Sequence, residues 1–261
     1  GAANESRMTC TEAGVCTPKA VYQYIQASVR TCASFYSNGS CKSWSNASTV
    51  TYRFNEAGVL QRKSGSNWVA ATNKAGSPIL NFNGVIYADG DVSRFGGPAR
   101  PSGQLDNPKA APPALASFAQ LTIAVEGTLT ITRDVKYEDP PCASAPVRQS
   151  NDTVTPAVCE NQDAVNVLGI YTQKGDIVIG NNNNNSSDDA PKDINIHAVL
   201  MSSEGMVTVE DFDKGGTRGA VSLLGGIIEN KYGAFGTFNS STGRQSTGYS
   251  RVFTYDPRMY A

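Results

Sequence analysis

The chain has 261 residues, of which 39% are hydrophobic and 17% charged, so it can bury a large core and is too apolar for a disordered protein. Its 22 Lys and Arg nearly balance its 23 Asp and Glu, which excludes a global basic field that would attract nucleic acid. Apolar runs such as residues 198–201 are far shorter than the ~20 residues that cross a bilayer. We therefore expect no contact of this chain with a membrane.

The first predicted element is a short amphipathic helix over residues 18–31. Thr17 is a capping residue, Pro18 follows at the first helical position, and Val21, Ile25 and Val29 recur at helical spacing. The pattern favours a helix that ends near Cys32.

A small antiparallel meander is predicted next. Its three strands are separated by polar turns that contain glycine, and they cover residues 50–54, 59–62 and 68–70. Residues 1–80 are therefore predicted to form a small, disulfide-stapled α+β subdomain with one helix and this three-stranded meander.

A different pattern begins after residue 80, where a β-rich run, a polar turn with glycine and a second β-rich run recur. The turn glycines are Gly90, Gly127, Gly175 and Gly205. Within residues 121–131, apolar side chains alternate with polar ones, and a single strand pair of this kind cannot cover its own apolar face. Stacked coils would cover it, so residues 81–261 are predicted to be a mainly β domain with a β-solenoid (β-helix-like) fold. An antiparallel β-sandwich is the alternative.

The six cysteines form three close pairs along the chain, without the C-x-x-C spacing of a zinc or redox site. The simplest pairing joins Cys10 to Cys16, Cys32 to Cys41, and Cys142 to Cys159. Disulfides persist outside the cytoplasm, so an extracellular protein is expected.

Catalytic chemistry has few candidates. His197 is the single histidine, which excludes a multi-histidine metal site, and its place in an alternating run indicates a strand histidine. Asp89 and Asp91 are the nearest match to the paired carboxylates of a β-helical polysaccharide-cleaving enzyme, but an Asp-Gly-Asp turn is more typical of structure. We expect no enzyme activity, no cofactor and no metal.

Much of the second region resembles a family of bacterial surface and pilus-associated proteins that includes the competence minor pilin ComZ. The matching segments are residues 85–92, 95–98, 121–123, 137–142, 190–193, 197–201, 223–230, 246–251 and 255–259. The resemblance implies a β-solenoid exposed at the tip of a type IV pilus, next to other minor pilins, that captures DNA in natural transformation. The chain lacks the long apolar N-terminal helix of a complete pilin, so it looks like an excised or inserted domain.

DNA capture without sequence preference requires Lys and Arg against phosphates. Residues 1–110 hold 11 basic and 6 acidic side chains, whereas residues 111–261 hold 11 and 17. The candidate DNA-binding residues in the basic part are Arg53, Arg62, Lys63, Lys74, Arg94 and Arg100. If Arg53 and Arg62 share a face of the meander, they can span neighbouring phosphates, and Tyr52 and Trp68 can stack on single-stranded DNA. An adhesin or glycan-binding module, using the outward polar and tyrosine side chains, is the alternative function.

Overall fold

The computed structural model describes residues 6–10, 16–143, 145–148, 154–180 and 190–260. The chain is mainly β and folds as two compact units. Ala20–Asn83 makes up most of the smaller unit, and Gly84–Ala261 makes up most of the larger one. Strands β1 (Ser6–Cys10) and β2 (Cys16–Ala20) form a separate two-stranded sheet.

The smaller unit is built on an antiparallel sheet with the strand order β3–β6–β7–β8. Strands lie at all three positions predicted for the meander. The sheet consists of β3 (Tyr22–Val29), β6 (Ser48–Asn55), β7 (Leu60–Ser64) and β8 (Asn67–Ala70).

The helix predicted over residues 18–31 is wrong, because strand β3 occupies most of that segment. Val21, Ile25 and Val29 are four residues apart, and a spacing of four fits the two-residue repeat of a strand as well as a helical turn. Every residue of β3 pairs with one on β6, from Tyr22 opposite Asn55 to Val29 opposite Ser48. Pairing with β6 therefore decides between two structures that the local pattern allows.

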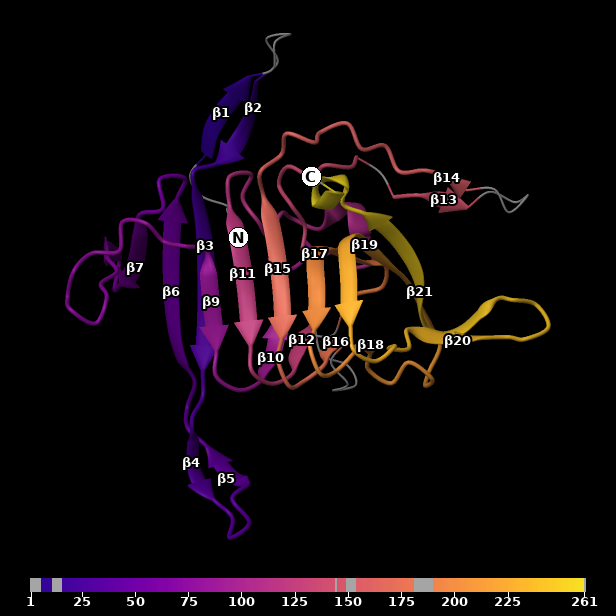
Figure 1. Cartoon of the computed structure of the whole chain (residues 1–261), viewed down its shortest axis with the longest axis horizontal. Coiled ribbons are helices and arrows are strands. Elements are labelled where there is room, and N and C mark those ends of the chain that lie inside the picture. The colour runs from indigo at the N-terminus through magenta and orange to yellow at the C-terminus, as the bar shows by residue number, and fades with distance from the viewer. Residues whose placement is uncertain (1–5, 11–15, 144, 149–153, 181–189, 261) are drawn as a thin grey trace. The chain divides into compact units, whose positions relative to one another are not determined.

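The larger unit contains two sheets whose strands alternate along the chain (Figure 1). The first has the order β20–β21–β19–β17–β15–β11–β9 and consists of β9 (Val85–Ala88), β11 (Gln120–Val125), β15 (Val167–Thr172), β17 (Ile194–Ser202), β19 (Thr217–Glu229), β20 (Gly236–Phe238) and β21 (Gln245–Tyr255). The second has the order β10–β12–β16–β18 and consists of β10 (Val92–Phe95), β12 (Leu129–Ile131), β16 (Ile177–Ile179) and β18 (Val207–Val209).

Pairing in these two sheets is parallel, apart from the antiparallel pair of β20 and β21 at one edge. This does not fit the β-sandwich alternative, whose sheets are antiparallel. Minor elements are the hairpin of β13 (Val147–Arg148) and β14 (Val154–Thr155) and the 3-10 helices η1 (Pro108–Ala110) and η2 (Pro257–Tyr260).

The core of the larger unit comes from the alternating side chains. The apolar set predicted within residues 121–131 is buried, with exposures of 8% or less, and comprises Leu121, Ile123, Val125, Leu129 and Ile131. Side chains of the following strands continue it, among them Leu168, Ile170, Ile177, Ile179, Val207 and Val209. Burial of this set holds successive strand pairs against each other.

The recurring turn glycines are stacked, so that the backbone of each turn contacts the backbone of the next. The amide of Gly127 donates to the carbonyl oxygen of Gly90 at 3.1 Å. A Cβ atom on Gly175 would lie 2.5 Å from the carbonyl carbon of Gly127, and one on Gly205 would lie 2.7 Å from the carbonyl oxygen of Gly175. Side chains are therefore excluded where one turn meets the next, which explains why glycine recurs there.

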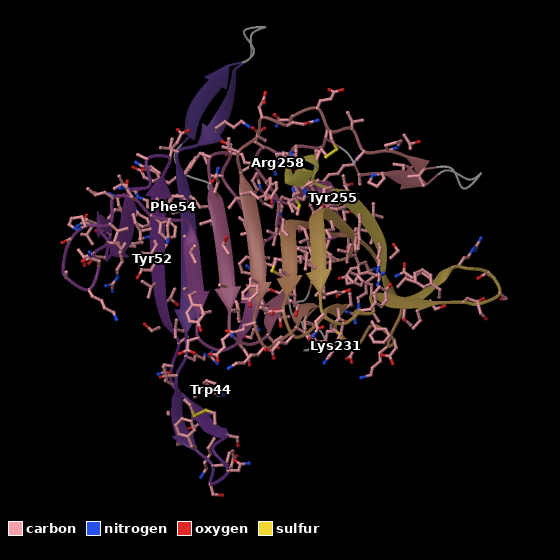
Figure 2. All side chains as sticks on the ribbon, viewed as in Figure 1. Trp44, Tyr52, Phe54, Lys231, Tyr255 and Arg258 are labelled. Atoms are coloured by element: carbon pink, nitrogen blue, oxygen red, sulfur yellow. A yellow bond between two sulfur atoms is a disulfide. The ribbon has the colours of Figure 1, made fainter. Side chains whose placement is uncertain are left out.

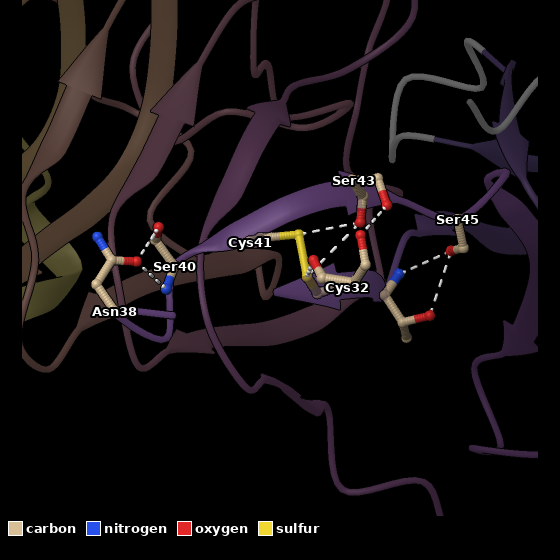
Figure 3. Close-up of a disulfide and its surroundings, with 8 residues drawn as sticks. Cys32, Asn38, Ser40, Cys41, Ser43 and Ser45 are labelled. Carbon is tan, nitrogen blue, oxygen red and sulfur yellow. Dashed lines mark hydrogen bonds between the residues drawn. A yellow bond between two sulfur atoms is a disulfide. The ribbon is translucent and has the colours of Figure 1, made fainter. Parts of the chain in front are cut away.

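Two of the three expected disulfides are confirmed. Cys32 and Cys41 close the hairpin of β4 (Cys32–Phe35) and β5 (Cys41–Trp44), as Figure 3 shows, and Cys142 is bonded to Cys159. The side chains of Cys10 and Cys16 lie outside the described part of the chain. Two disulfides fit a protein that folds outside the cytoplasm.

Candidate nucleic-acid interface

The four-stranded sheet of the smaller unit has two different faces, because residues directly opposite each other in an antiparallel sheet point to the same side. One face carries the buried residues Gln23, Phe54 and Leu60, and Phe54 packs edge-on against Phe82. Figure 2 shows Phe54 with Tyr52 on strand β6.

The opposite face combines rings with cations. The register places Tyr24 opposite Arg53, Arg53 opposite Gln61, and Lys63 opposite Trp68. We call this surface the aromatic–basic face, and it consists of Tyr22, Tyr24, Arg53, Gln61, Lys63 and Trp68. Each of its three rings is partly exposed.

Arg53 lies at the centre of the aromatic–basic face. Its guanidinium carbon is 3.9 Å from the ring centre of Tyr22 and 4.4 Å from that of Trp68, within the range of cation–π attraction. Its Nε donates to Oε1 of Gln61 at 2.8 Å, and the residue is 9% exposed. Arg53 therefore holds two rings in fixed positions, and little of it is open to a phosphate.

Lys63 gives the aromatic–basic face an exposed charge. Its Nζ is 6.0 Å from the ring centre of Trp68, and the ring of Tyr24 meets that of Trp68 edge-on with 5.7 Å between the ring centres. An exposed ammonium beside fixed rings can contact a phosphate while a base stacks on a ring.

Arg62 does not share a face with Arg53. It pairs with Tyr52, whereas Arg53 pairs with Gln61, so the two arginines point to opposite sides of the sheet. The expected span of neighbouring phosphates by this pair is therefore wrong. Arg62 is exposed on the side of Tyr52, and Lys74 is exposed in the loop after β8.

Arg100 is also wrong as a DNA contact, because it is an interior residue of the larger unit. Its Nε and Nη2 donate to the two carboxylate oxygens of Asp134 at 2.7 and 2.9 Å. The remaining guanidinium hydrogens go to the carbonyl oxygens of Leu105, Lys192 and Asp193. Arg94 belongs to the same unit and is exposed on β10. The six predicted cations are thus not brought together on one surface of either unit.

His197 and the Asp89–Asp91 pair have structural roles. Nδ1 of His197 accepts the amide hydrogen of Tyr137, and burial lowers the pKa of the imidazole to about 3, so the ring is neutral. Oδ1 of Asp91 accepts from the amide of Thr128 in the next turn. A hydrogen bond to Glu126 raises the pKa of Asp89.

The charges of the two units differ strongly, in line with the residue counts over residues 1–110 and 111–261. Ala20–Asn83 contains six Lys and Arg and a single acidic residue, Glu56, for a net charge of +5. Gly84–Ala261 contains 14 Lys and Arg and 20 Asp and Glu, for a net charge of −6. The basic excess therefore belongs to the unit that bears the aromatic–basic face.

Comparison of the chain with protein-family models, curated proteins and solved structures found no match. Within the described ranges, no group of His, Cys, Asp and Glu has the arrangement of a metal site. The same ranges contain no helix long and apolar enough to cross a membrane.

Proposed function

We propose that the chain is an extracellular, non-enzymatic module that binds DNA without sequence preference on the aromatic–basic face. The observation that carries the proposal is a compact unit of net charge +5 whose exposed sheet face interleaves cations with partly exposed rings. Proteins that bind single strands combine a positive surface with rings on which bases stack.

In this proposal the charges of the smaller unit attract the phosphate backbone, and release of condensed counterions supplies the affinity. Lys63 contacts a phosphate, and Arg62 and Lys74 add to the positive potential of the unit. Arg53 positions Tyr22 and Trp68, and bases of a single-stranded segment stack on the exposed parts of Trp68 and Tyr24. Duplex DNA has no free base faces, so only the phosphate contacts remain.

We propose that the two alternating parallel sheets of the larger unit form the walls of a short β-solenoid. The stacked turn glycines and the buried side chains between successive strands support this interpretation. The sequence resemblance to pilus-associated proteins suggests that the module acts at a pilus tip, beside other minor pilins, in DNA capture for natural transformation.

The test is fluorescence anisotropy with a labelled single-stranded oligonucleotide and with the duplex of the same sequence, over a range of salt concentrations. Wild-type protein should bind both, with affinity that falls steeply as salt rises. Trp68→Ala should weaken single-strand binding by about 5- to 150-fold and change duplex binding little. Lys63→Ala should weaken binding of both the single strand and the duplex. It should also reduce by about one the slope of the logarithm of the binding constant against the logarithm of the salt concentration.

Lys214→Ala is the matched control, because Lys214 is an exposed lysine of the larger unit that pairs with Asp211. It should leave both affinities unchanged. DNA binding that is absent, or that survives the combined loss of Lys63 and Trp68, would exclude the aromatic–basic face as the site.

A further inference from the structure

The outward face of the larger sheet carries an ordered row of apolar side chains. Parallel pairing brings one residue from each of five adjacent strands, β9, β11, β15, β17 and β19, into register. We call this set the tyrosine row, and it consists of Tyr87, Ala124, Tyr171, Met201 and Ile228. Tyr87 is 61% exposed and Ile228 51%, whereas the inward-pointing side chains of the middle strands, among them Ile123, Ile170 and Leu200, belong to the core.

A second row of the same kind lies two residues back along each strand, on the same face. It consists of Val85, Thr122, Gly169, Val199 and Gly226. Neither row contains a charged residue. Together the two rows form what we call the uncharged face, on the side of the larger sheet opposite the core. The strands that carry it, β9, β11, β15, β17 and β19, lie side by side in Figure 1.

The two tyrosines of the row are separated by a small residue. Tyr87 and Tyr171 flank Ala124, so they are two strand spacings apart, about 9.6 Å. Backbone hydrogen bonds between the strands fix this separation. In a β-1,4-linked polysaccharide successive sugar rings are turned over, and every second ring presents the same face at a similar separation. Two such rings can therefore stack on the two tyrosines at once.

Polar groups adjoin the tyrosine row at the ends of the strands. Asp89 and Glu126 continue the outward positions of β9 and β11, and Nζ of Lys174 is 2.5 Å from Oε1 of Glu126. The pKa of Lys174 is raised, chiefly by its hydrogen bond to Glu126. The two carboxylates and this ammonium therefore lie just beyond the Tyr87 end of the tyrosine row, where they can bond to sugar hydroxyls.

We propose that the uncharged face is a second binding site, for an extended neutral polysaccharide of the β-1,4-linked class. Its apolar centre suits the C–H faces of sugar rings, and its polar border suits their hydroxyls. DNA does not fit this surface, since neither row offers a cation to a phosphate and the unit has a net charge of −6. The proposal is independent of DNA binding, which concerns the other unit.

The probes are cellohexaose and chitohexaose, measured by isothermal titration calorimetry against the whole chain. We expect wild-type protein to bind at least one of them with an affinity that does not change with salt, because no charge is neutralised. Tyr87→Ala and Tyr171→Ala should each lower the affinity about tenfold or more, and Tyr87→Phe, which keeps the ring, should retain most of it. Tyr36→Ala removes an exposed tyrosine of the smaller unit and should have no effect on sugar binding.

Chemical-shift changes of the Ile228 and Met201 methyl groups on addition of the hexaose give a measurement on the wild-type protein alone. The proposal is overturned if neither sugar binds, if the Tyr87→Ala, Tyr171→Ala double variant binds as tightly as wild type, or if those methyl signals do not move. It is also overturned if the double variant loses only self-association, because the face would then be a contact between two copies of the chain. Trp68→Ala should weaken single-strand binding and leave sugar binding unchanged, which separates this proposal from the one for DNA.

Discussion

Arg100 and Asp134 form a doubly hydrogen-bonded ion pair inside the larger unit, with each side chain 2% exposed. The other oxygen contacts of this pair are also internal, since Oδ1 of Asp134 accepts from the amide and the side chain of Asn195. The pair thus joins the segment before β11 to the start of β17. Removal of one partner would leave the other charge buried without compensation.

Arg100→Ala should therefore lower the free energy of unfolding by about 3–5 kcal/mol, as for other broken buried ion pairs. Chemical denaturation monitored by circular dichroism measures the change. Arg94→Ala, which removes an exposed arginine of the same unit, should stay within about 0.5 kcal/mol of wild type. Equal stabilities of the two variants would show that the pair is not needed for folding.

His197 should make stability depend on pH on the acidic side. Burial lowers its pKa in the folded state from 6.5 to about 3, with a smaller lowering by Lys136. Between these values the unfolded chain binds a proton that the folded chain does not, so stability is fully present above pH 6.5 and is lost as pH falls towards 3.

The measurement compares urea midpoints of wild type and His197→Gln across this range, since a glutamine oxygen can also accept a hydrogen bond. The wild type should lose more stability than the variant as pH falls, and the difference should be constant above pH 6.5. Parallel curves over the whole range would mean that the imidazole is accessible to protons in the folded protein.

Two neighbouring glycines of β19 provide a matched pair of backbone variants. Gly225 has φ 152°, and a Cβ atom there would lie 1.8 Å from the carbonyl oxygen of Ala198 on the adjacent strand. A Cβ atom on Gly226 would meet nothing closer than Cε of Met259, at 3.5 Å.

Gly225→Ala should thus lower the free energy of unfolding by about 3 kcal/mol or more, because strain and a displaced strand pair add together. Gly226→Ala should change it by no more than about 1 kcal/mol. Thermal unfolding of the two variants under the same conditions measures both changes. Similar losses of stability would mean that strand β17 can shift at Ala198 at little cost.

Local patterns in the sequence predicted the interior of the larger unit well. The alternation from Leu121 to Ile131 needs only the two-residue repeat of a strand. The turn glycines could be found because one glycine recurs between the two β-rich runs of each repeat. The disulfides of Cys32 with Cys41 and of Cys142 with Cys159 join residues close in sequence, so proximity predicted them.

Contacts between distant segments could not be predicted in this way. The residues around Arg100 in the sequence are typical of an exposed turn, so the sequence predicted an exposed arginine. Only the fold brings Asp134 and the carbonyl group of Lys192 to its guanidinium. Arg53 meets the ring of Tyr22 because β3 pairs with β6, a strand pair hidden by the helix prediction. The alternation of Tyr22, Gln23 and Tyr24 is typical of a strand, and this pattern could have predicted β3 and its pairing with β6.

The opposite charges of the two units limit how much of the molecule can attract a polyanion. A polyanion is attracted by the unit of net charge +5 and repelled by the unit of net charge −6. On the proposal of DNA binding, long-range attraction therefore comes from the smaller unit alone, and the larger unit subtracts from it. Salt screens both contributions.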